Sequence, residues 1–144
     1  MIVLDASAAL DLLLRDEGTF EWLERRLVGE GLVAAPHLLD TEVAHVLRKH
    51  VFGGRLEEAR AAEALTDLDE LPLDRHAAQP LLGRIWELRH NLSGYDATYV
   101  ALAEALDAPL VTTERRLLDL PASASGATIE SIHGIRAPRG RPRR

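Results

Sequence analysis

The sequence contains no cysteine, which excludes a disulfide framework and any chemistry that depends on a thiolate. Aromatic residues number six in 144, too few for a stacking platform along single-stranded nucleic acid. No apolar run approaches the roughly 20 residues that a membrane-spanning helix requires. The first residues, MIVLDASAAL, lack a basic leader and a small-residue cleavage site. We therefore expect a soluble, cytoplasmic protein with no membrane partner.

Basic residues are scarce over most of the chain and concentrated at its end. Five of the 17 Lys and Arg residues lie in the last nine positions, RAPRGRPRR, whereas residues 1–135 carry 12 basic and 23 acidic groups. A domain with this excess of acidic residues is not a general nucleic-acid binder, because non-specific binding depends on Lys and Arg that neutralise phosphates. We divide the chain into one domain, residues 1–135, and an Arg- and Pro-rich tail, residues 136–144, which is expected to be mobile.

Short apolar runs alternate with segments of helical spacing along the domain. Strands are predicted at 1–5, 32–36, 71–74, 108–113 and 128–132, the last as an edge strand. Helices are predicted at 7–14, 19–28, 38–51, 56–71, 77–90 and 95–106, with an awkward Pro80 in the fifth. This alternation implies a mostly parallel central sheet with helices on both faces, a three-layer α/β/α domain.

Two acids fall where a parallel sheet places its functional sites, beyond the carboxyl ends of the strands. Asp5 ends the first predicted strand, and Glu114 follows the fourth. Two more acids border apolar helix faces: Glu42 flanks the stripe of the third helix, and Asp96 opens an otherwise apolar sixth helix. Because desolvated carboxylates repel one another, a shared hard cation such as Mg²⁺ or Mn²⁺ is their simplest partner.

Each of the four acids also has an ordinary structural explanation. Asp5 can cap the helix that follows it. Ser93 and Asp96 have the spacing of a capping box, in which Asp96 reaches back to the Ser93 N–H. Glu42 can be a surface acid, and Glu114 can be a solvated loop acid. The residues alone leave both sets of explanations open, although the structural set requires four separate coincidences.

Other polar residues are predicted to lie outside this site. His45 and His50 are five positions apart, which does not suit a zinc pair on one helix turn. Asp40 is two positions from Glu42 and therefore points to a different helix face. Asp11 lies among leucines and is expected to cap or pair locally.

Four segments taken in order resemble a known family: MIVLDASAAL, PHLLDTEVAHVLR, RHNLSGYDATYVALAEAL and LVTTERRL. They resemble the PIN-domain ribonucleases, and among these the VapC-type toxins of bacterial toxin–antitoxin pairs. The resemblance runs from Met1 to about Ile132. It implies that residues 1–135 form a PIN-like nuclease domain with a Mg²⁺ or Mn²⁺ site that cleaves RNA. The acids of that site carry over to Asp5, Glu42, Asp96 and Glu114.

The resemblance also implies a role for each acid. Asp5 and Asp96 are expected to bind the metal directly, whereas Glu42 and Glu114 can act through water. The fourth acid is more often Asp in this family, so the extra methylene of Glu114 changes its reach and makes direct ligation less secure.

Further residues of the resembling segments are candidates for support and substrate binding. Ser7 and Thr112 are expected to support the acids with their hydroxyl groups, the alternative being ordinary cap and strand hydroxyls. Arg89 and Asn91 are candidates for holding the substrate phosphate, since Arg suits bidentate phosphate contacts, the alternative being a surface salt bridge.

The resemblance implies three partners: a small VapB-like antitoxin that blocks the site, an RNA with structured, exposed loops, and a second copy in a homodimer. We predict the antitoxin groove between the helices at 19–28 and 38–51, because Phe20, Trp22 and Leu23 are more bulk than one short helix needs. The alternative is that these three side chains fill the core.

Two other enzyme classes fit the sequence less well, and two further alternatives keep the PIN fold but assign it another role. A phosphoacceptor receiver domain needs an acceptor Asp near position 52, where the chain reads HVFGG. A haloacid-dehalogenase-type phosphatase needs a second Asp at the position of Ser7. A PIN-fold binding module with a degenerate site and a housekeeping PIN nuclease without a toxin role remain as alternatives.

Overall fold

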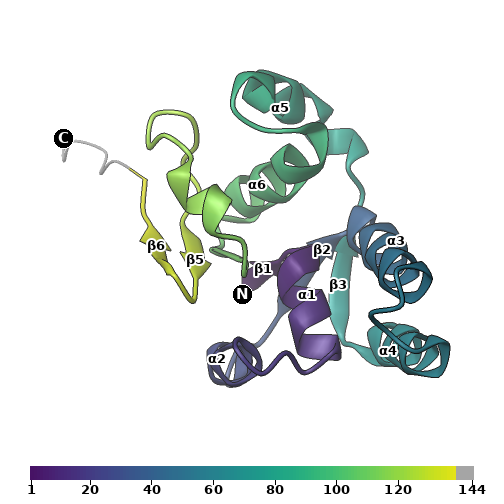
Figure 1. Ribbon diagram of the computed structural model, residues 1–144. Coiled ribbons are helices and arrows are strands. Elements are labelled where there is room, and N and C mark those ends of the chain that lie inside the picture. The colour runs from purple at the N-terminus through teal and green to yellow at the C-terminus, as the bar shows by residue number, and fades with distance from the viewer. Residues whose placement is uncertain (139–144) are drawn as a thin grey trace.

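The computed structural model describes residues 1–138, and its centre is one six-stranded sheet between two layers of helices (Figure 1). The strands are β1 (Ile2–Leu4), β2 (Val33–Pro36), β3 (Leu73–His76), β4 (Leu110–Val111), β5 (Ile129–Ser131) and β6 (Gly134–Arg136). Their order in the sheet is β3-β2-β1-β4-β5-β6, and every neighbouring pair is parallel except β5 with β6. The predicted three-layer α/β/α architecture with a mostly parallel sheet is confirmed.

The α-helices are α1 (Ala6–Leu13), α2 (Phe20–Leu27), α3 (Leu38–Phe52), α4 (Glu58–Glu70), α5 (Leu82–Glu87) and α6 (Gly94–Leu106). Three short 3₁₀ helices complete the set: η1 (Gln79–Leu81), η2 (Leu88–His90) and η3 (Arg115–Asp119). None of the helices in residues 1–138 is both long and apolar enough to cross a membrane.

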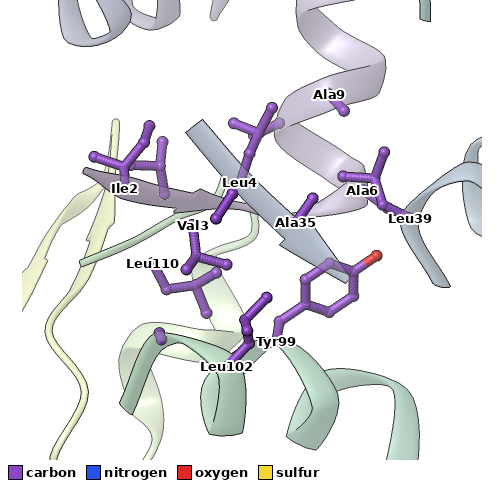
Figure 2. Close-up of a cluster of buried hydrophobic side chains, with 14 of the residues drawn as sticks. Ile2, Val3, Leu4, Ala6, Ala9, Ala35, Leu39, Tyr99, Leu102 and Leu110 are labelled. Atoms are coloured by element: carbon purple, nitrogen blue, oxygen red, sulfur yellow. The ribbon is translucent and has the colours of Figure 1, made fainter. Parts of the chain in front are cut away.

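The core lies on both faces of β1 and of its two neighbours, β2 and β4. Figure 2 shows α1 on one face of β1, where Ala6 and Ala9 face the sheet, and α6 on the other, where Leu102 packs beneath Val3. Helix α6 is buried along its whole middle, residues 97–103, as its nearly continuous apolar sequence predicts. Burial on two faces explains why the central strand is an unbroken apolar run rather than an alternating one.

Two predicted elements differ from the structure. The helix predicted at 77–90 begins only at Gln79 and is divided into η1, α5 and η2, and Pro80 lies in the first turn of η1, where a missing N–H is tolerated. The strand predicted at 128–132 is not the edge of the sheet, because β6 pairs antiparallel with β5 and covers it. The tight turn between them uses Gly134 at φ 142°, a conformation that favours glycine, and β6 is too short to show a strand pattern.

The prediction of an antitoxin groove between the helices at 19–28 and 38–51 is wrong. Helix α1 packs against both α2 and α3 and lies between them, so these two helices do not form a shared wall (Figure 1). Leu23 is fully buried and Trp22 packs against the core, which supports the alternative that the bulk of α2 fills the interior.

The predicted boundary after residue 135 falls inside β6, so Arg136 belongs to the fold rather than to the tail. Its guanidinium is buried and donates hydrogen bonds to four backbone carbonyl groups, those of Leu120, Pro121, Ser125 and Ala127. These carbonyls belong to the loop between η3 and β5, which Arg84 and Glu104 also hold through Ala124, Ser125 and Gly126. The rest of the predicted tail, residues 139–144, lies outside the described residues.

We predict that Arg136→Ala lowers the free energy of unfolding by about 2–4 kcal/mol, because several buried carbonyl groups lose a charged donor at once. Urea denaturation followed by circular dichroism measures this change. The matched control is Ile135→Ala on the same strand, whose side chain is exposed and whose loss should cost little. Equal effects of the two substitutions would contradict a stabilising role for Arg136.

Candidate active site

Four acids from four elements converge beyond the carboxyl ends of β1 and β4. These strands are parallel neighbours, with Leu4 beside Val111, so the residues that follow them emerge at the same place. The Asp5 N–H donates to the Val111 carbonyl at 3.1 Å, and Glu114 follows three residues later. Glu42 reaches this place from the first half of α3, and Asp96 reaches it from the first turn of α6.

A cleft of about 440 Å³ opens beside two of these acids, Glu42 and Asp96, whereas Asp5 and Glu114 do not line it. It is lined by Glu42, Asn91, Leu92, Ser93, Tyr95, Asp96, Arg116 and Leu117. A second, more apolar hollow adjoins it and shares Glu42 and Tyr95 with it. A bound chain could therefore pass the acids and continue over α3.

Asp5 is both a helix cap and a buried member of the acid cluster. Its Oδ1 atom accepts hydrogen bonds from the Ala8 N–H at 2.9 Å and from the Ser7 hydroxyl at 2.8 Å. The capping explanation is therefore correct, but it uses only one of the two carboxylate oxygens. The side chain is 5% exposed, which is unusual for an acid whose only task is to cap a helix.

Two hydroxyl groups tie the loops that carry Asp5 and Glu114 together. The Ser7 hydroxyl lies 3.2 Å from the Thr112 hydroxyl and accepts the Thr113 N–H. Thr112 is fully buried, and its hydroxyl accepts the Glu114 N–H at 3.0 Å. The two residues predicted to support the acids thus lie directly between them and fix the direction in which Glu114 leaves β4.

The cluster favours the protonated form of its most buried members. Burial raises the pKa of Asp5 to about 6, against hydrogen bonds from Thr112, Ala8 and Ser7 that favour its charged form, and the charge of Glu114 raises it further. Burial also raises the pKa of Glu42, and the charges of Asp96 and Asp5 add to this effect. Burial is the main cause of both shifts, and the charges of neighbouring acids add to it.

Glu42 and Tyr99 contain the buried polar atoms that lack a partner in residues 1–138. The Glu42 Oε1 atom and the Tyr99 hydroxyl are both buried, and neither makes a hydrogen bond of ordinary geometry. Figure 2 shows Tyr99 reaching from α6 toward the end of the sheet where α3 begins. Burial, followed by the charge of Glu42, raises the pKa of Tyr99, so this hydroxyl stays protonated. An unpartnered carboxylate oxygen among acids is a place that a cation would satisfy.

Arg116, which the sequence analysis did not select, is the positive charge nearest to the cluster. Its Nη1 and Nη2 atoms donate to the two carboxylate oxygens of Asp96, and its Nε donates to Glu114 at 2.8 Å. These contacts raise the pKa of Arg116, with the bond to Asp96 the largest cause. The signal was present in LVTTERRL, since an acid expected to lie among other acids is followed two residues later by Arg.

The predicted capping box at the start of α6 is only half formed. The Ser93 hydroxyl accepts the Asp96 N–H at 3.2 Å, as predicted. Both oxygens of the Asp96 carboxylate accept from Arg116 instead of turning back to the Ser93 N–H. Asp96 therefore faces the cleft, which the capping explanation did not require.

The remaining polar residues divide between the cleft and the surface. Asn91 lines the cleft, whereas Arg89 stacks over the Trp86 ring at 4.6 Å and lies outside the lining. Asp40 makes a bidentate ion pair with Arg75, which explains its separation from the site.

Asp11 pairs locally but also borders the cluster. Its carboxylate accepts the Thr19 hydroxyl at 3.0 Å, in agreement with the expected local role. Burial raises its pKa, and the charge of Glu114 contributes to the shift. The acid cluster is therefore wider than the four predicted residues.

The donor set consists of carboxylate oxygens, the ligands that Mg²⁺ and Mn²⁺ prefer. Among residues 1–138, however, no three His, Asp or Glu side chains approach closely enough to hold one ion in the present arrangement. The guanidinium of Arg116 lies between Asp96 and Glu114, so these two acids share an arginine in place of a closer approach.

Comparison with known proteins gives consistent matches. The family model of the PIN domain matches residues 2–122. Ribonuclease VapC9 of Mycobacterium tuberculosis is 46% identical over 119 residues, which cover 83% of this chain and 90% of that protein.

Solved structures with low sequence identity show the same fold. The structure of VapBC2 from Rickettsia felis, bound to a DNA fragment from their promoter, superposes with a TM-score of 0.65 at 15% identity and covers 91% of this chain and 98% of that one. A toxin–antitoxin complex from Klebsiella pneumoniae gives a TM-score of 0.55 at 19% identity, with 79% and 87% covered.

The raised pKa of Asp5 predicts a pH-dependent stability. Between pH 4 and 6 the folded chain keeps a proton that the unfolded chain releases, so stability falls as the pH rises and stays low above pH 6. Asp5→Asn removes this penalty, because the amide oxygen can still cap α1. We compare the free energy of unfolding of Asp5→Asn with that of the wild type at each pH. This difference should be more favourable to Asp5→Asn at pH 8 than at pH 4, by roughly 2–3 kcal/mol.

Urea denaturation in EDTA at pH 4 and pH 8 measures this difference. The control is Asp67→Asn on the exposed face of α4, which should show no such pH dependence. An effect of Asp5→Asn that is the same at both pH values would show that Asp5 ionises normally.

Proposed function

Because this chain belongs to the PIN-domain family and is a VapC-type ribonuclease within it, we propose that it is the toxin of a type II toxin–antitoxin pair and needs Mg²⁺ or Mn²⁺ to cut RNA. One observation carries the metal part of this proposal. Four acids leave four different elements and meet at one edge of the sheet, although each could have been satisfied separately at the surface.

The residues present offer the carboxylate oxygens that a divalent cation prefers, although the side chains must move closer together to hold one ion. Glu42 has a buried carboxylate oxygen without a partner, and Asp5 is held among acids at the cost of a raised pKa. We propose that Asp5 and Asp96 hold the ion directly and that Glu42 and Glu114 act through water. The side chain of Glu114 is 41% exposed and longer than Asp, which suits an outer position.

When bound, the divalent ion would supply Lewis-acid activation of water and of the phosphoryl oxygen for in-line displacement. The chain's own residues prepare that chemistry. The helix cap fixes Asp5, and we propose that Ser7 and Thr112 support the acids by holding the two loops in register. The side chain of Asn91 lies in the cleft wall, where it could donate to a phosphate oxygen.

Arg89 is the weaker of the two phosphate candidates. It donates to the Trp86 carbonyl and stacks on the Trp86 ring at the exposed surface. A contact between Arg89 and RNA would therefore involve nucleotides beyond the cleft. We propose such a contact only for an RNA that extends past the cleft, through nucleotides that flank the cleavage site.

The charge of the protein suggests selectivity rather than general affinity for RNA. Residues 1–135 carry 23 acidic and 12 basic groups, so most of the surface repels a phosphate backbone. An RNA must then be recognised by its shape at the cleft. We propose structured RNAs with exposed loops, because unpaired loops present both splayed bases and an accessible backbone.

The proposed partners extend the same reasoning. A free ribonuclease would damage its own cell, so a VapB-like antitoxin is proposed to block the cleft until the pair separates. The two solved structures named above contain a VapBC2 assembly and a toxin–antitoxin complex, which supports this proposal by analogy. A homodimer and a cytoplasmic location are proposed on the resemblance to the same toxins.

We predict RNA cleavage that requires Mg²⁺ or Mn²⁺ and stops in EDTA. Asp5→Asn and Asp96→Asn should each lower the rate by roughly 100-fold or more, because each removes a negative charge from the proposed ion site. A gel assay with a pool of structured RNAs measures cleavage. Asp67→Asn makes the same chemical change on an exposed part of α4 and should leave the rate unchanged.

Undiminished cleavage by Asp5→Asn would place the chemistry elsewhere. A wild-type protein that is folded but inactive under all metal conditions would favour a degenerate PIN-fold binding module.

We predict growth arrest when the chain is expressed alone in a bacterial host. Coexpression of the adjacent open reading frame should relieve the arrest by supplying the antitoxin, and Asp5→Asn should relieve it by removing activity. Colony counts after induction measure both effects, with immunoblots to confirm equal expression. An active, soluble enzyme that causes no arrest would favour a housekeeping PIN nuclease.

A further inference from the structure

One arginine serves two of the four acids at once. The planar fork of Arg116 donates from two nitrogens to Asp96 and from Nε to Glu114. Such bidentate contacts are stronger than single ones and are specific in direction. Arg116 thereby offsets part of the negative charge of Asp96 and Glu114 from within the chain.

The side chain of Arg116 approaches the acids from the solvent side. It is 58% exposed, whereas the side chain of Asp96 beneath it is 15% exposed. The backbone that carries it is fixed, because Leu117 is buried and Arg136 holds the Leu120 carbonyl at the end of η3. The guanidinium can therefore turn into solvent without loss of buried apolar contacts and without movement of the loop.

A divalent cation and this guanidinium compete for the same carboxylate oxygens. The two positive charges repel each other, and every oxygen that Asp96 offers to an ion now accepts from Arg116. The guanidinium side of this pair faces solvent, so a doubly charged ion can reach it and compete for the Asp96 oxygens.

We propose that Arg116 is a built-in counter-ion that competes with the divalent cation for Asp96 and Glu114. It links Asp96 to Glu114 without metal, and an ion that binds Asp96 must compete with it for both carboxylate oxygens. The affinity of the site for metal is therefore set by exchange against Arg116 and not by the acids alone. This inference rests on the proposed metal-dependent function.

Isothermal titration of the full chain with Mn²⁺, in the absence of RNA, tests the exchange directly. Arg116→Gln should bind Mn²⁺ about 3- to 10-fold more tightly than the wild type, because the competitor is gone. Arg116→Lys keeps the charge but loses the fork, so its affinity should lie between those two. Arg115→Gln is the matched control, since it removes the same charge from the adjacent, exposed position and should stay within about twofold of wild type.

The outcomes separate this inference from the proposed function. Equal or weaker Mn²⁺ binding by Arg116→Gln, with normal binding by the wild type, would overturn the competition and leave the metal site intact. An equal gain from Arg115→Gln would also overturn it, because the effect would then be one of net charge. Failure of every variant to bind Mn²⁺ would overturn the proposed metal site together with the exchange. Thermal melting of each variant confirms that the fold is unchanged.

Discussion

The parallel pairing of β1 with β4 is the constraint on which the candidate site depends. The two strands are short, and their register sets Leu4 beside Val111, so that Asp5 and Thr112 leave the sheet as neighbours. The hydrogen bond from the Asp5 N–H to the Val111 carbonyl extends this pairing by one residue. A shift of one residue would send these side chains to the opposite faces of the sheet and separate the acids.

The helices complete the site because each begins at the same edge. Asp5 caps α1 and so turns the chain away from the sheet, while the Ser93 cap sets the first turn of α6 and aims Asp96 into the cleft. At the start of α1 and of α6, the interactions that cap the helix therefore also place an acid at the candidate site. The structural explanation is correct for Asp5 and half correct for Asp96, and both carboxylates also lie at the candidate site, so capping does not exclude the functional explanation.

The acid cluster is an unfavourable arrangement that the rest of the fold sustains. Like charges and burial raise the pKa values of Asp5, Asp11 and Glu42, and Arg116 offsets only part of this cost. Buried apolar residues of β1, α1 and α6 hold the elements in place regardless of these charges. Strained charge at one edge of a well-packed sheet is typical of a site kept for its chemistry, because stability alone would replace such acids.

The sequence by itself determined the layered fold, the strands and the long helices, since apolar periodicity depends only on which face of each element is buried. The resemblance to the PIN-domain ribonucleases also indicated that Asp5, Glu42, Asp96 and Glu114 belong together, whereas strand ends and apolar helix faces alone left this open. Only the tertiary structure decided what pairs with Asp96 and Glu114: the geometry of a guanidinium between two carboxylates depends on distances across separate elements. For the same reason the β6 edge and the buried Arg136 could not be read from local pattern. Each is fixed by partners that lie at least several residues away along the chain.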